Sequence, residues 1–171
     1  ALHLAGKGDR GLRNGGCATP GTLPVLPGQV IADRFVLERL AAAGGMGSVY
    51  RALDRVTGEP VALKVIGGGG AHDLRFEREA ELLASFAHPG IVRYVSHGQS
   101  AAGERYLAME WLEGVDLAAA LYERGLSMAD GVRLVARVAE ALGHAHQRGV
   151  VHRDVKPSNL FLVGAEVGAA K

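Results

Sequence analysis

One short polar stretch near the end of the chain combines residue types that can do chemistry together. Asp154, Lys156 and Asn159 lie within six residues, and an apolar run, residues 160–163, follows at once. Such a loop presents a carboxylate to a hydroxyl nucleophile, an ammonium group to a phosphate and an amide oxygen to a metal ion. Phosphoryl transfer needs these groups, because its catalysis is mostly positioning and charge stabilisation. The alternative is a basic turn that leads into a strand.

Two features earlier in the chain fit the same chemistry. A glycine turn at Gly44, Gly45 and Gly47 lets backbone N–H groups approach phosphates, because no side chain stands in the way. An ordinary hairpin turn explains this stretch equally well. Lys64 lies within the apolar strand of residues 61–66, where a buried ammonium group without a partner would be costly. The alternative is a lysine on an edge strand, with its charged end in water.

The first half of the chain is predicted to form a sheet with one helix. Five segments have the composition and turn spacing of antiparallel strands, namely residues 34–40, 48–53, 61–66, 91–97 and 105–110. The helix is predicted over residues 73–86, and its apolar face should consist of Leu74, Leu82, Leu83 and Phe86. The pair His88-Pro89 should end it, because a proline disfavours helix in the residue before it.

The second half is predicted to be helical. A short helix covers residues 116–123, and a longer one follows over residues 128–148. Ser127 should cap the longer helix together with Asp130, three residues on, and Gly149 should end it. The core stripe of this helix is predicted to consist of Val132, Val135, Val138, Ala139, Leu142 and Ala145.

Composition narrows the class of protein. The chain has 171 residues, is 48% hydrophobic and 22% charged, and has a net charge of +1. This is a globular composition, and the charge balance gives no reason to expect nucleic-acid binding. Residues 1–28, rich in glycine, should form a flexible leader, and no membrane segment is expected because prolines interrupt the longest uncharged run. The single cysteine, Cys17, fits a reducing compartment, so a cytoplasmic location is expected.

The motifs together resemble one family. Residues 152–159, His-Arg-Asp-Val-Lys-Pro-Ser-Asn, match the catalytic loop of protein kinases. The sequence motifs Gly-Gly-Met-Gly-x-Val-Tyr and His-Pro-x-Ile-Val are most similar to those of bacterial serine/threonine kinases of the eukaryotic type. The resemblance implies an α+β, protein-kinase-like fold. Residues 29–113 would form the N-lobe and hinge, with a five-stranded antiparallel sheet and one helix, and residues 114–171 the beginning of a mainly helical C-lobe.

The resemblance assigns roles to the polar loop. Asp154 matches the catalytic base, Lys156 the residue that stabilises the γ-phosphate, and Asn159 a ligand of Mg²⁺. Arg153 matches the arginine that pairs with a phosphorylated activation loop. His152 is expected to be a packed, hydrogen-bonded structural residue. Lys156 also implies serine/threonine specificity, because tyrosine kinases have a different pattern there.

The resemblance also implies a nucleotide site. Lys64 would contact the α- and β-phosphates of ATP and pair with Glu79, which stands nine residues before His88; Glu77 and Glu81 would be solvated charges. Met109 would be the gatekeeper, Asp116 would contact the ribose, and Ala42 stands where the first glycine of the phosphate loop is expected. The full set of cofactor-binding positions is Ala42, Gly44, Gly45, Gly47, Val49, Ala62, Lys64, Glu79, Met109, Glu110, Leu112, Asp116 and Leu160.

The expected function is that of a serine/threonine protein kinase, with ATP and Mg²⁺ as cofactors and proteins carrying serine or threonine as partners. An Asp-Phe-Gly motif is absent from the 171 residues, so we expect a partial catalytic domain that is inactive alone and incompletely packed beyond Gly114. One alternative is a nucleotide-binding pseudokinase or inactive fragment with a regulatory or binding role. Another, a small-molecule phosphotransferase of similar fold, is disfavoured by Lys156-Pro157.

Overall fold

The structure is a computed structural model, and it describes residues 27–44, 47–66 and 73–164. Within the helix that begins at residue 73, the side chains of residues 73–75 and 79 are not described. Residues 1–26 of the expected leader and Gly45 of the glycine turn also lie outside the described residues.

The described residues form two compact units. The sheet unit contains the described residues up to Ala84 together with Tyr94–Trp111. The helical unit contains Ser85–Arg93 and the described residues from Leu112 onward.

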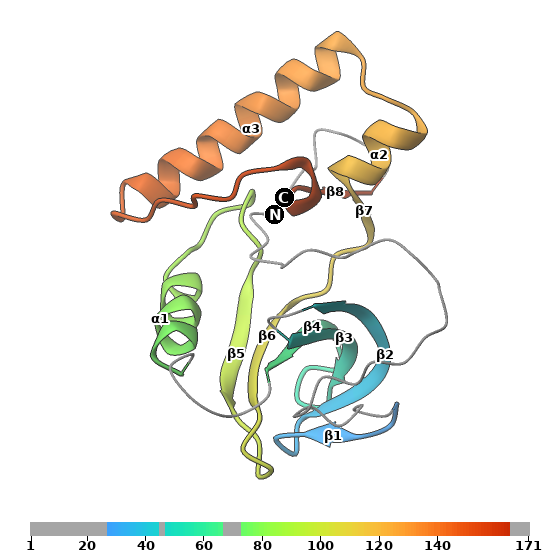
Figure 1. The fold of residues 1–171 in the computed structure, drawn as a ribbon, viewed down its shortest axis with the longest axis vertical. Coiled ribbons are helices and arrows are strands. Elements are labelled where there is room, and N and C mark those ends of the chain that lie inside the picture. The colour runs from blue at the N-terminus through green and yellow to red at the C-terminus, as the bar shows by residue number, and fades with distance from the viewer. Residues whose placement is uncertain (1–26, 45–46, 67–72, 165–171) are drawn as a thin grey trace. The chain divides into compact units, whose positions relative to one another are not determined.

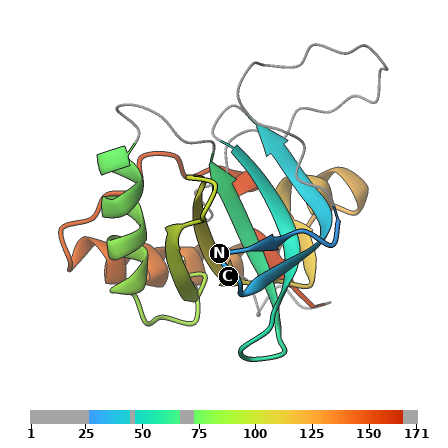
Figure 2. The same ribbon diagram turned by 90° about the horizontal axis from the view of Figure 1, so that it is seen from below.

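One antiparallel sheet dominates the sheet unit (Figures 1 and 2). Its strands are β1 (Val30–Ile31), β2 (Phe35–Gly44), β3 (Gly47–Asp54), β4 (Pro60–Ile66), β5 (Tyr94–Gln99) and β6 (Arg105–Glu110), in the spatial order β1-β2-β3-β4-β6-β5. The predicted antiparallel sheet is confirmed, and each of the five predicted strands overlaps an observed strand. The sixth strand, β1, was not predicted. Ala32 and Asp33 adopt left-handed backbone conformations and turn the chain, so that β1 pairs with the start of β2.

The start of β5 corrects the predicted strand of residues 91–97. Pro89 and Gly90 lead into a turn in which the Ile91 N–H donates to the His88 carbonyl oxygen at 3.0 Å. Ile91 and Val92 are buried, but they belong to the helical unit and not to the sheet. Their apolar character signalled burial, and the sequence did not distinguish a buried turn from a strand.

The helix α1 (Asp73–Ala84) packs beside β5 (Figure 2). Phe76, Ala80 and Leu83 are buried, at the spacing of one helical face. The predicted face was partly wrong: Leu82 is 44% exposed and Phe86 lies beyond the end of the helix, whereas Leu83 is confirmed. The Leu74 side chain is outside the described residues.

The helical unit pairs two short strands, β7 (Gly114–Asp116) and β8 (Phe161–Val163), with α2 (Leu117–Glu123) and α3 (Met128–His146). The strand β7 was not predicted, and α2 begins one residue later than expected. Gly114 is required here, because a Cβ at this position would collide with the carbonyl oxygen of Leu162. One core cluster of the unit contains Leu117, Ala120, Leu134 and Leu162. None of the described helices is long and apolar enough to cross a membrane.

The ends of α3 are confirmed, and its predicted buried face is right only in part, at Val138 and Ala145. The Ser127 hydroxyl oxygen accepts the Asp130 N–H at 3.1 Å, and Gly149, with a φ of +73°, follows the last turn. Val132 and Val135 are 64% and 67% exposed, and Ala139 is also exposed, so the predicted stripe is wrong at these positions. The face that packs inward consists of Leu134, Val138, Ala141 and Ala145.

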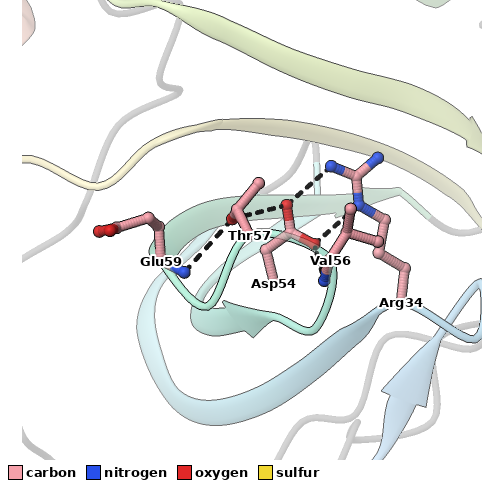
Figure 3. Close-up of polar contacts among 5 residues, drawn as sticks. All are labelled: Arg34, Asp54, Val56, Thr57 and Glu59. Carbon is pink, nitrogen blue, oxygen red and sulfur yellow. Dashed lines mark hydrogen bonds and ion pairs between the residues drawn. The ribbon is translucent and has the colours of Figure 1, made fainter.

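A buried carboxylate joins β2 to the turn after β3 (Figure 3). Asp54 is fully buried, and both oxygens accept hydrogen bonds from Arg34, at 2.8 Å and 2.7 Å. The Val56 N–H and the Thr57 hydroxyl also donate to it, at 3.0 Å and 3.2 Å. Chiefly because of the hydrogen bonds from Arg34, the pKa of Asp54 falls from 3.8 to about 2. Sequence analysis did not find this network, because its two charges stand 20 positions apart.

We predict that Asp54→Asn lowers the free energy of unfolding of the sheet unit by about 2 kcal/mol at pH 7. Because the folded-state pKa is depressed, this contribution is complete above about pH 4 and is lost as the pH falls towards 2. Urea unfolding followed by fluorescence of Trp111, the single tryptophan, measures it. Glu59→Gln, an exposed change in the same turn, is the matched control. Equal stability of the Asp54 variant and wild type at pH 7 would contradict the prediction.

Candidate active site

The polar loop of the sequence lies between α3 and β8 and is fixed at both ends. Before the loop, the Val150 N–H donates to the Ala145 carbonyl oxygen at 3.1 Å, which closes the end of α3. A single 3₁₀ turn, Pro157–Asn159, follows the polar residues. After it, the Leu117 N–H donates to the Leu160 carbonyl oxygen at 2.8 Å, which joins the loop to the start of α2.

The three predicted catalytic residues are in direct contact. The Lys156 Nζ donates to the Asp154 Oδ2 at 2.6 Å. The Asn159 Nδ2 donates to the same oxygen at 3.0 Å and to the Asp154 carbonyl oxygen at 2.8 Å. Asn159 is 3% exposed, whereas the Asp154 side chain is 57% exposed. A buried amide therefore holds a carboxylate that faces solvent.

Charge and hydrogen bonding keep this carboxylate ionised. The hydrogen bond from Lys156 is the main cause that lowers the pKa of Asp154, and the bond from Asn159 lowers it further. The Asp154 N–H donates to the His152 Nδ1 at 3.3 Å, and burial lowers the pKa of His152. The expectation of a packed, hydrogen-bonded histidine fits these contacts. Arg153 between them is exposed and has a φ of +61°, an uncommon conformation for a residue with a side chain.

Asn159 meets the requirement for a ligand of Mg²⁺. Both of its hydrogen bonds to Asp154 use the amide nitrogen, so neither occupies the lone pairs of the Oδ1 oxygen. Amide and carboxylate oxygens are the donors that Mg²⁺ prefers. The residues of the loop therefore fit the ion that the sequence analysis expects, and the assignment of Asn159 as ligand stays a prediction.

In the sheet unit, Lys64 occupies an interior strand. It lies on β4 between Val49 of β3 and Leu107 of β6, and it is 7% exposed. The alternative of an edge-strand lysine is therefore wrong. The side chain of Glu79, its expected partner, lies outside the described residues, so the ion pair stays a prediction.

The two acidic neighbours of Glu79 on α1 differ from each other. Glu81 is exposed, as expected. Glu77 is 53% exposed, as expected of a solvated charge, and its Oε1 also accepts a hydrogen bond from Arg105 at 2.9 Å. This contact was not predicted, because Arg105 lies 28 residues away on β6.

Several other predicted nucleotide positions share one face of the sheet. Ala42 pairs with Val49 and Val49 with Lys64, while Ala62, two residues before Lys64, pairs with Met109. Cross-strand partners, and residues two apart on one strand, point to the same face. The register therefore gathers residues of four strands on one surface.

The hairpin that contains Gly44 and Gly47 has a structural need for glycine. These residues pair with each other at the end of β2 and β3. Gly47 has a φ of +117°, and a Cβ on it would collide with the carbonyl oxygen of Val65. The fold of the hairpin therefore requires glycine at residue 47, with or without a phosphate nearby.

The remaining predicted positions divide between the units. Glu110 ends β6 in the sheet unit, whereas Leu112, Asp116 and Leu160 belong to the helical unit. Asp116 caps α2, because its Oδ1 accepts the Ala119 N–H at 2.9 Å. Its expected contact with a ribose stays a prediction, as does the joining of both sets of residues into one nucleotide site.

Comparison with known proteins identifies the family. The sequence model of the protein kinase domain matches residues 35–169. The chain belongs to the protein kinase family. Among its kinase relatives, the serine/threonine-protein kinase PknJ of Mycobacterium tuberculosis is 39% identical over 145 residues, which are 82% of this chain and 24% of PknJ. PknA of the same organism is 38% identical over 144 residues, which are 79% of this chain and 33% of PknA.

Solved structures of kinase domains confirm the predicted protein-kinase-like fold. The crystal structure of the Mycobacterium tuberculosis PknI kinase domain superimposes with a TM-score of 0.68 at 32% sequence identity, covering 81% of this chain and 58% of that one. The chain thus spans about a quarter to a third of these two kinase relatives and less than two thirds of the PknI kinase domain.

We predict that Lys156→Met raises the pKa of Asp154 towards its ordinary value, because the hydrogen bond from Lys156 is the main cause of the shift. Titration of the Asp154 carboxyl carbon by NMR measures it. Arg153→Gln is the matched control, since it removes a neighbouring charge that makes no hydrogen bond or ion pair with Asp154 among the described contacts. An unchanged Asp154 pKa in the Lys156 variant would show that the 2.6 Å contact does not govern the carboxylate.

Proposed function

We propose that the protein containing this chain is a serine/threonine protein kinase that transfers the γ-phosphate of ATP to protein hydroxyl groups. The observation that carries the proposal is the contact of Asp154 with both Lys156 and Asn159 in a loop that is fixed by α3 and β8. The printed names of the kinase relatives, which are serine/threonine-protein kinases, support the choice of substrate class.

Asp154 would act as the base of the reaction. Its carboxylate is ionised and more than half exposed, so it can accept a hydrogen bond from a substrate hydroxyl group. The hydroxyl oxygen forms a bond to the γ-phosphorus, the bond to the bridging oxygen of ADP breaks, and the hydroxyl proton passes to Asp154. Lys156 would exchange part of its contact with Asp154 for the transferring phosphate.

Two further residues would hold the nucleotide and its metal. Asn159 would offer its Oδ1 oxygen to Mg²⁺, which when bound supplies positive charge that offsets the charge of the phosphates. Lys64 would direct its ammonium group to the α- and β-phosphates and pair with Glu79. The position of Lys64 on an interior strand supports this assignment, because a buried cation requires a counter-charge.

The nucleotide base would lie against apolar residues of the same sheet face. Ala62 and Met109 are cross-strand partners, and Val49 lies beside them on β3. Glu110 and Leu112 would supply backbone groups to the edge of the adenine. The protein substrates and a cytoplasmic location are part of this proposal, and they rest on the kinase assignment and the composition.

We predict Mg²⁺-dependent transfer of radiolabelled phosphate from ATP to serine or threonine by the complete natural protein. Asp154→Asn should lower kcat by at least about a hundredfold, because it removes the base. Lys64→Met should also abolish transfer, because it removes the phosphate contact. Casein, a generic basic protein and the protein itself serve as test substrates. Phosphoamino-acid analysis then identifies the phosphorylated residue type. Arg133→Gln, an exposed change on α3, is the control.

Unreduced transfer by Asp154→Asn would contradict the assignment of the base. Binding of ATP without any transfer by the wild-type protein would instead support the pseudokinase alternative. Transfer to a small molecule but to no protein would support a phosphotransferase.

A further inference from the structure

Arg105, at the start of β6, contacts Glu77 and Phe76 of α1. Its Nη1 donates to the Glu77 Oε1 at 2.9 Å, and its guanidinium carbon lies 5.9 Å from the centre of the Phe76 ring. The Arg105 side chain is 16% exposed, whereas that of Glu77 is 53% exposed. The arginine is therefore largely fixed within the unit, and the helix is attached to it.

Phe76 extends this attachment to β5. It is 5% exposed, and its ring meets the His97 ring edge-on, with centroids 6.5 Å apart. The His97 Nδ1 is hydrogen-bonded to the Tyr94 hydroxyl group at 2.7 Å. Among the described side chains, Phe76 and the ion pair of Glu77 with Arg105 attach the first half of α1 to two neighbouring strands.

The helical positions of Glu77 and Glu79 explain what this attachment can do. Phe76, Ala80 and Leu83 form the face that packs on the sheet. Successive residues of a helix are rotated by about 100°, so Glu77 lies about 100° to one side of Phe76 and Glu79 about 60° to the other. A contact that fixes Glu77 therefore sets the rotation of α1 and, with it, the direction of the position that carries Glu79.

The sheet register places Arg105 near Lys64. Lys64 pairs with Leu107, and Arg105 stands two residues before Leu107 on β6. Residues two apart on one strand point to the same face, so Arg105 and Lys64 project from one face of neighbouring strands.

We propose that Arg105 is a positioning residue of the kinase reaction: through Glu77 and Phe76 it sets the rotation of α1, so that Glu79 is presented to Lys64. This inference rests on the proposed function, because it concerns the pairing that orders the phosphate contact. In this proposal Arg105 acts through the helix and not by direct contact with the nucleotide or the metal.

The test uses the complete natural protein. Glu77→Gln and Arg105→Gln should each lower kcat/KM for ATP by roughly fivefold, the scale of a partly exposed ion pair. The double variant Glu77→Arg with Arg105→Glu should recover most of the loss, because it restores the pair with reversed charges. Arg133→Gln removes an ion pair on α3 and should leave kcat/KM unchanged. Wild-type kcat/KM in both single variants would overturn the inference.

A double-mutant cycle separates positioning from general stability. If Arg105 acts through Glu79, Arg105→Gln should cause little further loss of kcat/KM in a Glu79→Gln background. Equal losses in the wild-type and Glu79→Gln backgrounds would mean that Arg105 acts by another route and would overturn the inference. Glu77→Gln serves the same cycle should Arg105→Gln fail to fold, because Glu77 is half exposed.

Amide hydrogen exchange distinguishes failure of the inference from failure of the proposed function. Arg105→Gln and Glu77→Gln should speed exchange across α1 by several-fold and leave α3 unchanged. If the variants exchange faster in α1 but the wild-type protein transfers no phosphate, the attachment is supported and the proposed function is refuted. Unchanged exchange in α1 would refute the attachment, whatever the activity.

Discussion

The buried amide of Asn159 is the constraint on which the candidate site depends. Its two hydrogen bonds reach both the backbone and the carboxylate of Asp154, so one side chain fixes where the loop runs and where the charge points. The amide lies in a buried position, where an unpaired donor would be costly, and the loop must therefore close around it. The capped end of α3 and the β7–β8 pair supply the rigid frame that makes this closure possible.

The sheet unit also contains buried charged side chains, and the two on β3 and β4 differ in their surroundings. Asp54 at the end of β3 accepts hydrogen bonds from Arg34, Val56 and Thr57, and this satisfies the carboxylate within the fold. It is a structural charge that connects β2 to the next turn. Lys64 is buried on the neighbouring strand β4, on the face that also carries other predicted nucleotide positions. The contrast shows why burial of a charged side chain does not by itself indicate function.

The helix α1 connects the sheet to the proposed chemistry. Phe76, Ala80 and Leu83 form its buried apolar face, and the hydrophobic effect that favours their burial has no preferred direction. The hydrogen bond from Arg105 to Glu77 adds a directional contact to this packing. In our proposal, the rotation of the helix thus depends on a strand that follows it in the chain.

The sequence by itself determined the family, the contact-forming loop residues Asp154, Lys156 and Asn159, the five main strands and the Ser127 cap. These features depend on spacing within a few residues, which the chain order fixes. Only the tertiary structure decided which stripe of α3 is buried, that residues 91–93 lie outside the sheet, and that β1 and β7 exist. It also brought together Arg34 with Asp54 and Arg105 with Glu77. Each of these outcomes depends on a partner surface that is distant in the sequence. A periodic pattern indicates that a face is apolar, but it does not indicate which residues will cover that face.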